Sequence, residues 1–312
     1  SGEKQPEVTN HDMMLPSAAM KRASGILTER SLIQSFRQLS LLTLVFLLLL
    51  MITSKAQNFE VGAWMGGANY FGDLNSNASF SMIRPAGGVF LRNNFNTRWV
   101  LKSSISFGQL AFDDKKSSNS FNRQRNLHFK SNVGEIAAML ELNFLEFNKK
   151  KKQQWFSPYF TIGFAAFYFN PQAEFQGEWY YLQPLGTEGQ NDPSYSNLDK
   201  YRIVNFAIPI GGGLKFSVGR NWNVGIFGDI RIAFTDYLDD VSGVYASPLS
   251  FDQGSTGLAY ALSDRSGEIG EPIAEPGKQR GTSAKNDFYL FAGVSVSYTI
   301  FRLKCPTPGA IR

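Results

Sequence analysis

The first candidate for a catalytic residue is His128, the one histidine outside the N-terminal 56 residues. Hydrolases and acyltransferases pair a histidine with a carboxylate or a serine for acid–base and nucleophilic steps. Asp113 and Asp114 precede His128 in the same polar stretch, so an Asp–His pair is conceivable. A single histidine near a strand end is far more often a surface or packing residue. We therefore predict no catalytic residue and no enzymatic activity.

Metal binding is tested next at three carboxylates, Asp236, Asp239 and Asp240, which fall within five positions. Ca²⁺ binds oxygen ligands, so these three carboxylates are candidates for a calcium site. They are weak candidates because their spacing matches no EF-hand loop. Aspartates also stabilise turns by accepting backbone N–H groups, and we favour this structural role. Cys305 is the only cysteine, which excludes an intrachain disulfide and a cysteine-rich metal site. The sequence has no nucleotide, dinucleotide or zinc motif, so we predict no cofactor.

The elements that would position these residues are β-strands. From Gln57 onward, eight segments alternate apolar and polar residues, the pattern of strands with one apolar face. In the last segment Phe288, Val294 and Ile300 share the apolar face, and Ser295 lies on the other. The segments lie at about 59–70, 85–92, 98–108, 135–144, 158–169, 204–218, 223–232 and 288–300. The predicted fold is all-β: an eight-stranded up-and-down transmembrane β-barrel of the outer-membrane type.

The polar faces of these segments combine small residues with opposite charges. Eight strands enclose an interior just wide enough for side chains to fill it. We therefore expect a packed ionic network in the lumen, and poor conduction of ions. Its predicted members are Glu135, Glu141, Lys215, Asp229 and Arg231, with Trp64 also facing inward. A soluble β-sandwich is the alternative, and the connectors and the N-terminus argue against it.

The connectors alternate in length. Long connectors lie at about 72–84, 109–128, 170–201 and 236–286, and shorter ones at Asn93–Thr97, Leu145–Gln154 and Gly219–Trp222. Outer-membrane barrels have short periplasmic turns and long extracellular loops. We therefore predict that the long connectors lie outside the cell, and that the short ones lie in the periplasm with both termini.

The N-terminal region has the three parts of a secretory signal. Basic residues run from Lys21 to Arg37, the apolar run Leu39–Ile52 is too short to span a bilayer, and Ser54 and Ala56 are small. We expect upstream residues and a cleavable signal peptide over 1–56, the barrel over 57–301 and a periplasmic tail over 302–312. Residues 1–56 contain six Lys/Arg and four Asp/Glu, so cleavage lowers the formal charge from +5 to +3. Such a small charge gives no reason to expect nucleic acid as a partner.

Several runs resemble a known family. The most specific are Leu182–Gln190 (LQPLGTEGQ) and Thr235–Ser242 (TDYLDDVS). Weaker ones are Tyr70–Leu74, Glu135 with Glu141–Phe144, Pro158–Tyr159 with Phe169–Pro171, and Tyr298–Pro306. Together they resemble the PorG-like outer-membrane barrels of the type IX secretion system. The resemblance implies a non-enzymatic outer-membrane subunit that anchors or assembles a periplasmic ring through a PorK-type lipoprotein. It supplies no catalytic residue.

The resemblance and the topology together place the contact surface on the periplasmic rim. The expected partner-binding residues are the lysine run Lys149, Lys150, Lys151 and Lys152, and Lys304 and Cys305 in the tail. The run is attractive to an acidic partner, although most such runs are simply solvated. The expected location of the protein is the outer membrane of the cell. Its expected partners are outer-membrane lipids and the periplasmic ring lipoprotein. The alternative is a stand-alone barrel that acts as an adhesin or a membrane stabiliser through its extracellular loops.

Overall fold

The computed structural model describes residues 2, 58–147, 155–192, 199–219, 221–251, 254 and 257–300. The chain divides into two compact units, Ser1–Lys55 and Ala56–Arg312, and every described strand and helix belongs to the second. The predicted signal peptide lies outside the described residues. So do the lysine run Lys149–Lys152 and the tail with Lys304 and Cys305.

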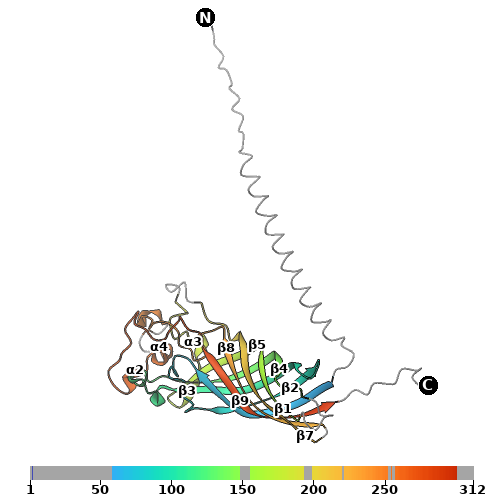
Figure 1. Ribbon diagram of the computed structural model, residues 1–312. Helices are drawn as coiled ribbons and strands as arrows, with labels where there is room; N and C mark the ends of the chain where they lie inside the picture. The colour runs from blue at the N-terminus through green and yellow to red at the C-terminus, as the bar shows by residue number, and fades with distance from the viewer. Residues whose placement is uncertain are drawn as a thin grey trace, which may run out of the picture. The chain divides into compact units, whose positions relative to one another are not determined.

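Antiparallel strands form a single closed sheet (Figure 1). The strand order is β4-β3-β2-β1-β9-β8-β7-β5-β6, and an additional pairing of β4 with β5 closes the ring. Eight strands make the barrel, and the short β6 only extends a hairpin from β5. The predicted eight-stranded up-and-down barrel is therefore confirmed. The strands are β1 (Asn58–Phe71), β2 (Arg84–Asn94), β3 (Trp99–Asp113), β4 (His128–Asn143), β5 (Phe156–Phe175), β6 (Glu178–Tyr181), β7 (Val204–Val218), β8 (Trp222–Ala233) and β9 (Phe288–Ile300).

Three strands are longer than the alternation predicts. β3 continues to Asp113 rather than residue 108, β4 begins at His128 rather than 135, and β5 continues to Phe175 rather than 169. Their backbone pairing continues without a break, for example from Ala111 opposite Lys130 to Lys130 opposite Gln172. The added residues keep a period of two with the faces exchanged: most outward side chains, such as Lys130, are polar, and inward ones, such as Phe129, are apolar.

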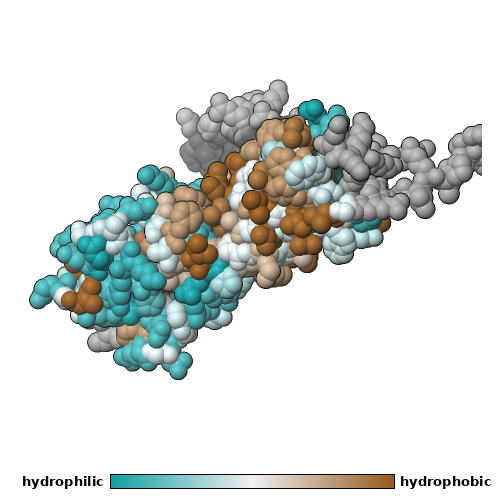
Figure 2. Space-filling view, turned by 60° about the horizontal axis from the view of Figure 1, so that its bottom comes forward, coloured by the Kyte–Doolittle hydropathy of each residue, from teal (hydrophilic) through white to brown (hydrophobic). Residues whose placement is uncertain are grey.

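An apolar belt covers the outward face of the barrel. On β4 the outward residues from 142 to 134 are Leu142, Leu140, Ala138, Ile136 and Gly134, and the next three are the polar Asn132, Lys130 and His128. The eight steps from residue 142 to residue 134, in a strand tilted by about 40°, rise roughly 21 Å, close to the ~25 Å apolar band of outer-membrane barrels. Figure 2 shows apolar residues gathered over the strand wall and polar ones over the end with the long connectors.

The two ends of the barrel differ. One end carries the connectors 72–83, 114–127, 176–203 and 234–287, which together we call the loop cap. The cap contains the short helices η1 (Asp114–Lys116), α2 (Ser120–Arg125), α3 (Leu182–Leu185), η3 (Pro248–Ser250), α4 (Leu258–Ser263) and η5 (Ser266–Glu268). The opposite end, here the turn end, carries the short connectors 95–98 and 219–221 and the start of β1 beside the end of β9. None of the helices in the described part of the chain is long and apolar enough to cross a membrane.

Candidate functional site

The lumen near the turn end holds a buried charge cluster. Arg92 on β2 donates from Nη1 to Glu60 Oε1 at 2.8 Å and from Nε to Glu141 Oε2 at 3.0 Å. Lys215 on β7 donates to the other oxygen of Glu141, and the Ser297 hydroxyl donates to Glu60. Each carboxylate is thus held by donors from other strands. Such pairing is what allows charges to remain in an interior closed to water.

A second charge cluster lies further along the lumen. Arg231 on β8 contacts both oxygens of Glu135 on β4, at 3.1 and 3.2 Å, and the Tyr289 hydroxyl donates to Glu135 at 2.7 Å. Asp229 lies 3.9 Å from Arg231 and 4.0 Å from Lys102. The structure therefore brings the five predicted lumen residues into two neighbouring clusters.

Sequence reasoning missed three members of these clusters: Glu60, Arg92 and Lys102. Each lies on the polar parity of its strand, and each is at most 4% exposed. Glu60 precedes the outward Val61, and Arg92 follows the outward Leu91. Applying the alternation rule to β1, β2 and β3 as fully as to β4 and β8 would have found them.

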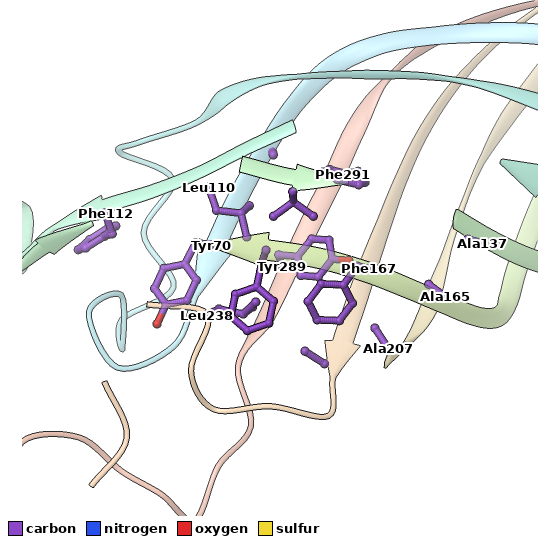
Figure 3. Close-up of a cluster of buried hydrophobic side chains, with 14 of the residues drawn as sticks. Tyr70, Leu110, Phe112, Ala137, Ala165, Phe167, Ala207, Leu238, Tyr289 and Phe291 are labelled. Atoms are coloured by element: carbon purple, nitrogen blue, oxygen red, sulfur yellow. The ribbon is translucent and has the colours of Figure 1, made fainter. Parts of the chain in front are cut away.

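Aromatic side chains fill the lumen between the charge clusters and the loop cap. Tyr289 packs against Phe167 with ring centroids 5.5 Å apart and against Phe291 at 5.4 Å, while Tyr70 meets Phe129 at 4.8 Å. Figure 3 shows Tyr70, Phe167 and Tyr289 inside the sheet, with Leu238 of the loop cap beside them. All of these rings are buried. The interior is therefore packed with side chains and is not an aqueous passage.

The two runs that carry the family resemblance pack against each other in the loop cap. Glu188 of the first run accepts N–H donors from Ser242 at 2.9 Å and from Gly243. The Thr187 hydroxyl donates to Asp240 of the second run at 2.5 Å. Arg280 joins the two, donating to Glu188 at 2.9 Å and to the Asp240 carbonyl at 2.7 Å. We call these contacts the clasp; they hold the connectors 176–203 and 234–287 together.

The three carboxylates considered for calcium have separate roles in the cap. Asp239 accepts from the Tyr70 hydroxyl at 2.5 Å and from the backbone N–H of Leu74 and Val241. Asp240 belongs to the clasp. Burial raises the pKa of Asp236 to about 7, and that of Asp240 to about 6 even though Arg280 opposes the shift. Within the described part of the chain, no three His, Cys, Asp or Glu side chains are placed to hold a metal ion.

His128 is not paired with Asp114. The Asp114 carboxylate instead binds Arg125 through Nε at 2.9 Å and Nη2 at 3.0 Å, and accepts the Leu127 N–H. His128 Nε2 accepts the Glu174 N–H at 3.1 Å, and the Arg265 guanidinium lies 2.9 Å from Nδ1. The contacts around His128 are thus those of a packing residue at the top of β4.

The geometry places the chain in the outer membrane. The closed sheet leaves no backbone edge unpaired, its outward belt is apolar, and its two charge clusters are buried in the lumen. These are the features that allow a β-sheet to span a lipid bilayer. The chain is an outer-membrane β-barrel protein.

Comparison with solved structures returns small outer-membrane barrels. Ail of Yersinia pestis, in complex with the heparin analogue sucrose octasulfate, is 8% identical, with 79% of this chain and 100% of that chain covered and a TM-score of 0.38. Neisserial surface protein A is 10% identical, with 78% and 97% covered and a TM-score of 0.37. OprG of Pseudomonas aeruginosa is 6% identical, with 80% and 98% covered and a TM-score of 0.33. Likenesses this low carry no information about activity.

The sequence comparisons are more specific. No curated protein matches the sequence significantly. A family model described as a domain of unknown function, DUF6089, matches residues 39–251, which include β1 to β8 and the clasp residues from Thr187 to Gly243. Because this match covers more than half of the chain, the protein belongs to the DUF6089 family.

Proposed function

We propose that this barrel is a non-enzymatic scaffold of the type IX secretion system, which anchors or assembles a periplasmic ring through a PorK-type lipoprotein. The observation that supports a scaffold is the filled lumen. Arg92, Arg231 and Tyr289 occupy the space through which a substrate would pass, and each is at most 2% exposed. The secretion role itself comes from the resemblance of the two clasp runs to PorG-like barrels. With no passage and no assembled catalytic group among the described residues, the protein would act through its rims.

The proposed orientation puts the turn end in the periplasm and the loop cap outside the cell, as in other outer-membrane barrels. Trypsin offers a test on intact cells. Lys278, with 49% of its side chain exposed, should be cleaved, while Arg280, with 2% exposed, should not. Cleavage within 145–154 should require a permeabilised outer membrane. Cleavage of 145–154 in intact cells, with Lys278 protected, would reverse the orientation.

The proposed partner surface is the turn end, through Lys149–Lys152 and through Lys304 and Cys305. The test is co-purification of the ring lipoprotein with the full chain from detergent-solubilised outer membranes. Changing Lys149–Lys152 to Glu, or deleting 304–312, should lower recovery of the ring protein about tenfold or more while the barrel still folds. The matched control is deletion of 270–276, an exposed stretch of the loop cap that leaves Ser266 and Arg280 in place. If only the control deletion abolishes recovery, the proposed surface is on the wrong rim.

A second candidate function is a stand-alone adhesin or membrane stabiliser. Leu249 in the loop cap is 92% exposed although the cap around it is held by buried ion pairs. A single exposed apolar residue is common on protein surfaces and does not by itself mark a contact, so Leu249 serves only as the position at which this function is tested. Loss of cell adhesion in Leu249→Ser, with ring-protein recovery unchanged, would favour this function over the scaffold.

A further inference from the structure

The extended ends of β3, β4 and β5 carry an open recess of about 590 Å³ on the loop-cap side of the apolar belt. Lys130, His128 and Glu174 contribute outward-facing side chains, since their strand neighbours are buried on the other face: Phe129 in the barrel core, and Ala173 against Leu182 and Leu262 of the loop cap. The recess is also lined by Arg84 at the start of β2, Lys115 of η1 and Trp179 of β6. We call this feature the rim recess.

Three cations of the rim recess lack a carboxylate partner. Among the described residues, no Asp or Glu lies within ion-pair distance of Arg84, Lys115 or Lys130. Arg265, by contrast, is neutralised by Glu268 at 2.8 Å. The Arg84 Nε is buried and has no hydrogen-bond acceptor. A buried donor without an acceptor carries an energetic cost that a bound anion would remove.

Lys130 is held in place by an aromatic ring. Its Nζ lies 3.3 Å from the centroid of the Trp179 ring, a close cation–π contact. Trp179 in turn makes an edge contact with His128 at 6.0 Å. The ammonium group is thereby positioned at the recess rather than free to follow solvent. Asp113 and Glu174, which also line the recess, are acceptors for neutral hydroxyl groups.

The height of the rim recess matches the headgroup layer of a membrane. The last outward apolar residues of the belt on this side are Phe107 on β3 and Tyr168 on β5, both opposite Gly134. Lys130 is four residues beyond Gly134, which is roughly 13 Å along the strand and about 10 Å along the membrane normal. The polar layer extends about 5–8 Å beyond the hydrocarbon core on each side, so Lys130 lies at its outer edge, at the level of the sugars and phosphates of a large glycolipid headgroup.

An apolar groove of about 390 Å³ lies within the belt on β1 to β4, two of which, β3 and β4, also carry the rim recess. It is lined by outward residues such as Val89, Ile105 and Ile136, with the small Ser103 at its floor. Ile136 is six residues from Lys130 on β4, or roughly 20 Å along the strand. The groove and the rim recess share no lining residue, so only a molecule that spans this distance would reach both. An outer-leaflet glycolipid has that form, with phosphates on its headgroup and acyl chains that extend toward the membrane centre, and this favours a lipid over a water-soluble anion.

We propose that the rim recess binds the phosphorylated saccharide headgroup of an outer-leaflet glycolipid. Arg84, Lys115 and Lys130 would bind its phosphates, Asp113 and Glu174 would accept hydrogen bonds from its sugar hydroxyls, and an acyl chain would lie in the groove. This inference rests on the membrane location of the barrel and on the proposed orientation, with the loop cap outside the cell. It is independent of any role in secretion, so it can fail while the proposed function stands.

The test measures displacement of fluorescent lipopolysaccharide from the full chain in detergent micelles. The double variant Arg84→Gln/Lys130→Gln should weaken binding by tenfold or more. The control, Lys116→Gln/Lys278→Gln, removes the same charge from exposed sites outside the recess and should change binding less than twofold. Folding of each variant is checked by the heat-dependent mobility shift of barrels in gels. The single variant Lys115→Gln, at an exposed side chain, gives a second measurement if the double variant is poorly folded, and it should weaken binding about threefold.

Four competitors identify the ligand. Intact lipopolysaccharide should displace the probe best, dephosphorylated lipopolysaccharide should be at least tenfold weaker, and inorganic phosphate should compete only at millimolar concentration. If the phosphorylated saccharide freed of acyl chains competes as well as the intact lipid, the ligand is a soluble anion and the lipid assignment is wrong. Equal losses in the recess variant and the control variant would reduce the effect to overall charge and overturn the proposal.

Discussion

Glu141 lies between two buried cations and accepts a hydrogen bond from each, Arg92 and Lys215. Glu141→Gln keeps the size of the side chain but removes the negative charge that both cations need. Breaking a buried ion pair from one side costs about 3–5 kcal/mol. We expect a loss of this size in urea unfolding in micelles, and less than about 0.5 kcal/mol for the exposed control Glu271→Gln. Equal effects in both variants would mean that the lumen cluster does not stabilise the barrel.

Asp236 makes the stability of the loop cap depend on pH. Its pKa of about 7 in the folded cap lies above the ordinary value of about 3.9 for an unfolded chain. Between these values the folded state binds more protons, so stability is greatest near pH 4 and falls as the pH rises to 7. Asp240, whose folded pKa is about 6, adds to the same trend.

The measurement is amide hydrogen exchange of residues 234–243 from pH 4 to 8, corrected for the intrinsic rate. We expect protection to decrease across this window, with a slope of at most about 1.4 kcal/mol per pH unit for each proton involved. Asp236→Asn should flatten the slope, since the amide cannot ionise. Protection that increases toward pH 7 would contradict the sign.

At the scale of the strand, β9 tests which face meets lipid. Val294 is 48% exposed and Ser295 is 5% exposed, so neighbouring residues face opposite environments. Val294→Arg should cost roughly 2–4 kcal/mol, the range for a cation near the midplane of a barrel. Two leucine variants give the matched comparison. Val294→Leu should leave the free energy of unfolding nearly unchanged, whereas Ser295→Leu should lower it by about 1–3 kcal/mol by overpacking the lumen. Unfolding from lipid vesicles measures all three variants, and a reversed leucine pattern would show that the faces are exchanged.

At the scale of the whole barrel, the two charge clusters, the aromatic layer and the loop cap follow one another along the barrel axis, from the turn end outward. Eight strands leave no aqueous channel once side chains fill the interior. We therefore expect planar-bilayer recordings with the full chain to show no large, steady openings. Frequent openings of porin size would require the cap and the aromatic layer to move together. They would argue for transport rather than anchoring.

Much of the barrel was predictable from the sequence because its main signal is local. Successive side chains on a strand point to opposite faces, so Val294 and Ser295 report lipid and lumen without any knowledge of their partners. The same rule places Glu141 and Arg231 inside and separates long connectors from short ones. Beyond the belt the two faces exchange polarity: the outward positions are polar and the inward ones, such as Phe129, are apolar. For that reason the outward Lys130 and Glu174 gave no sign that β4 and β5 continue past the belt.

Only the tertiary structure decided which separate parts of the chain contact one another. Arg280 meets Glu188 and Arg125 meets Asp114 across separations that no spacing rule covers, and the rim recess needs β2, β3, β4 and β6 at one level. The sequence by itself determined the architecture, since the period of a strand is set by covalent geometry. It could not determine the cap or the recess, because irregular loops have no period and their partners are chosen only when the barrel closes.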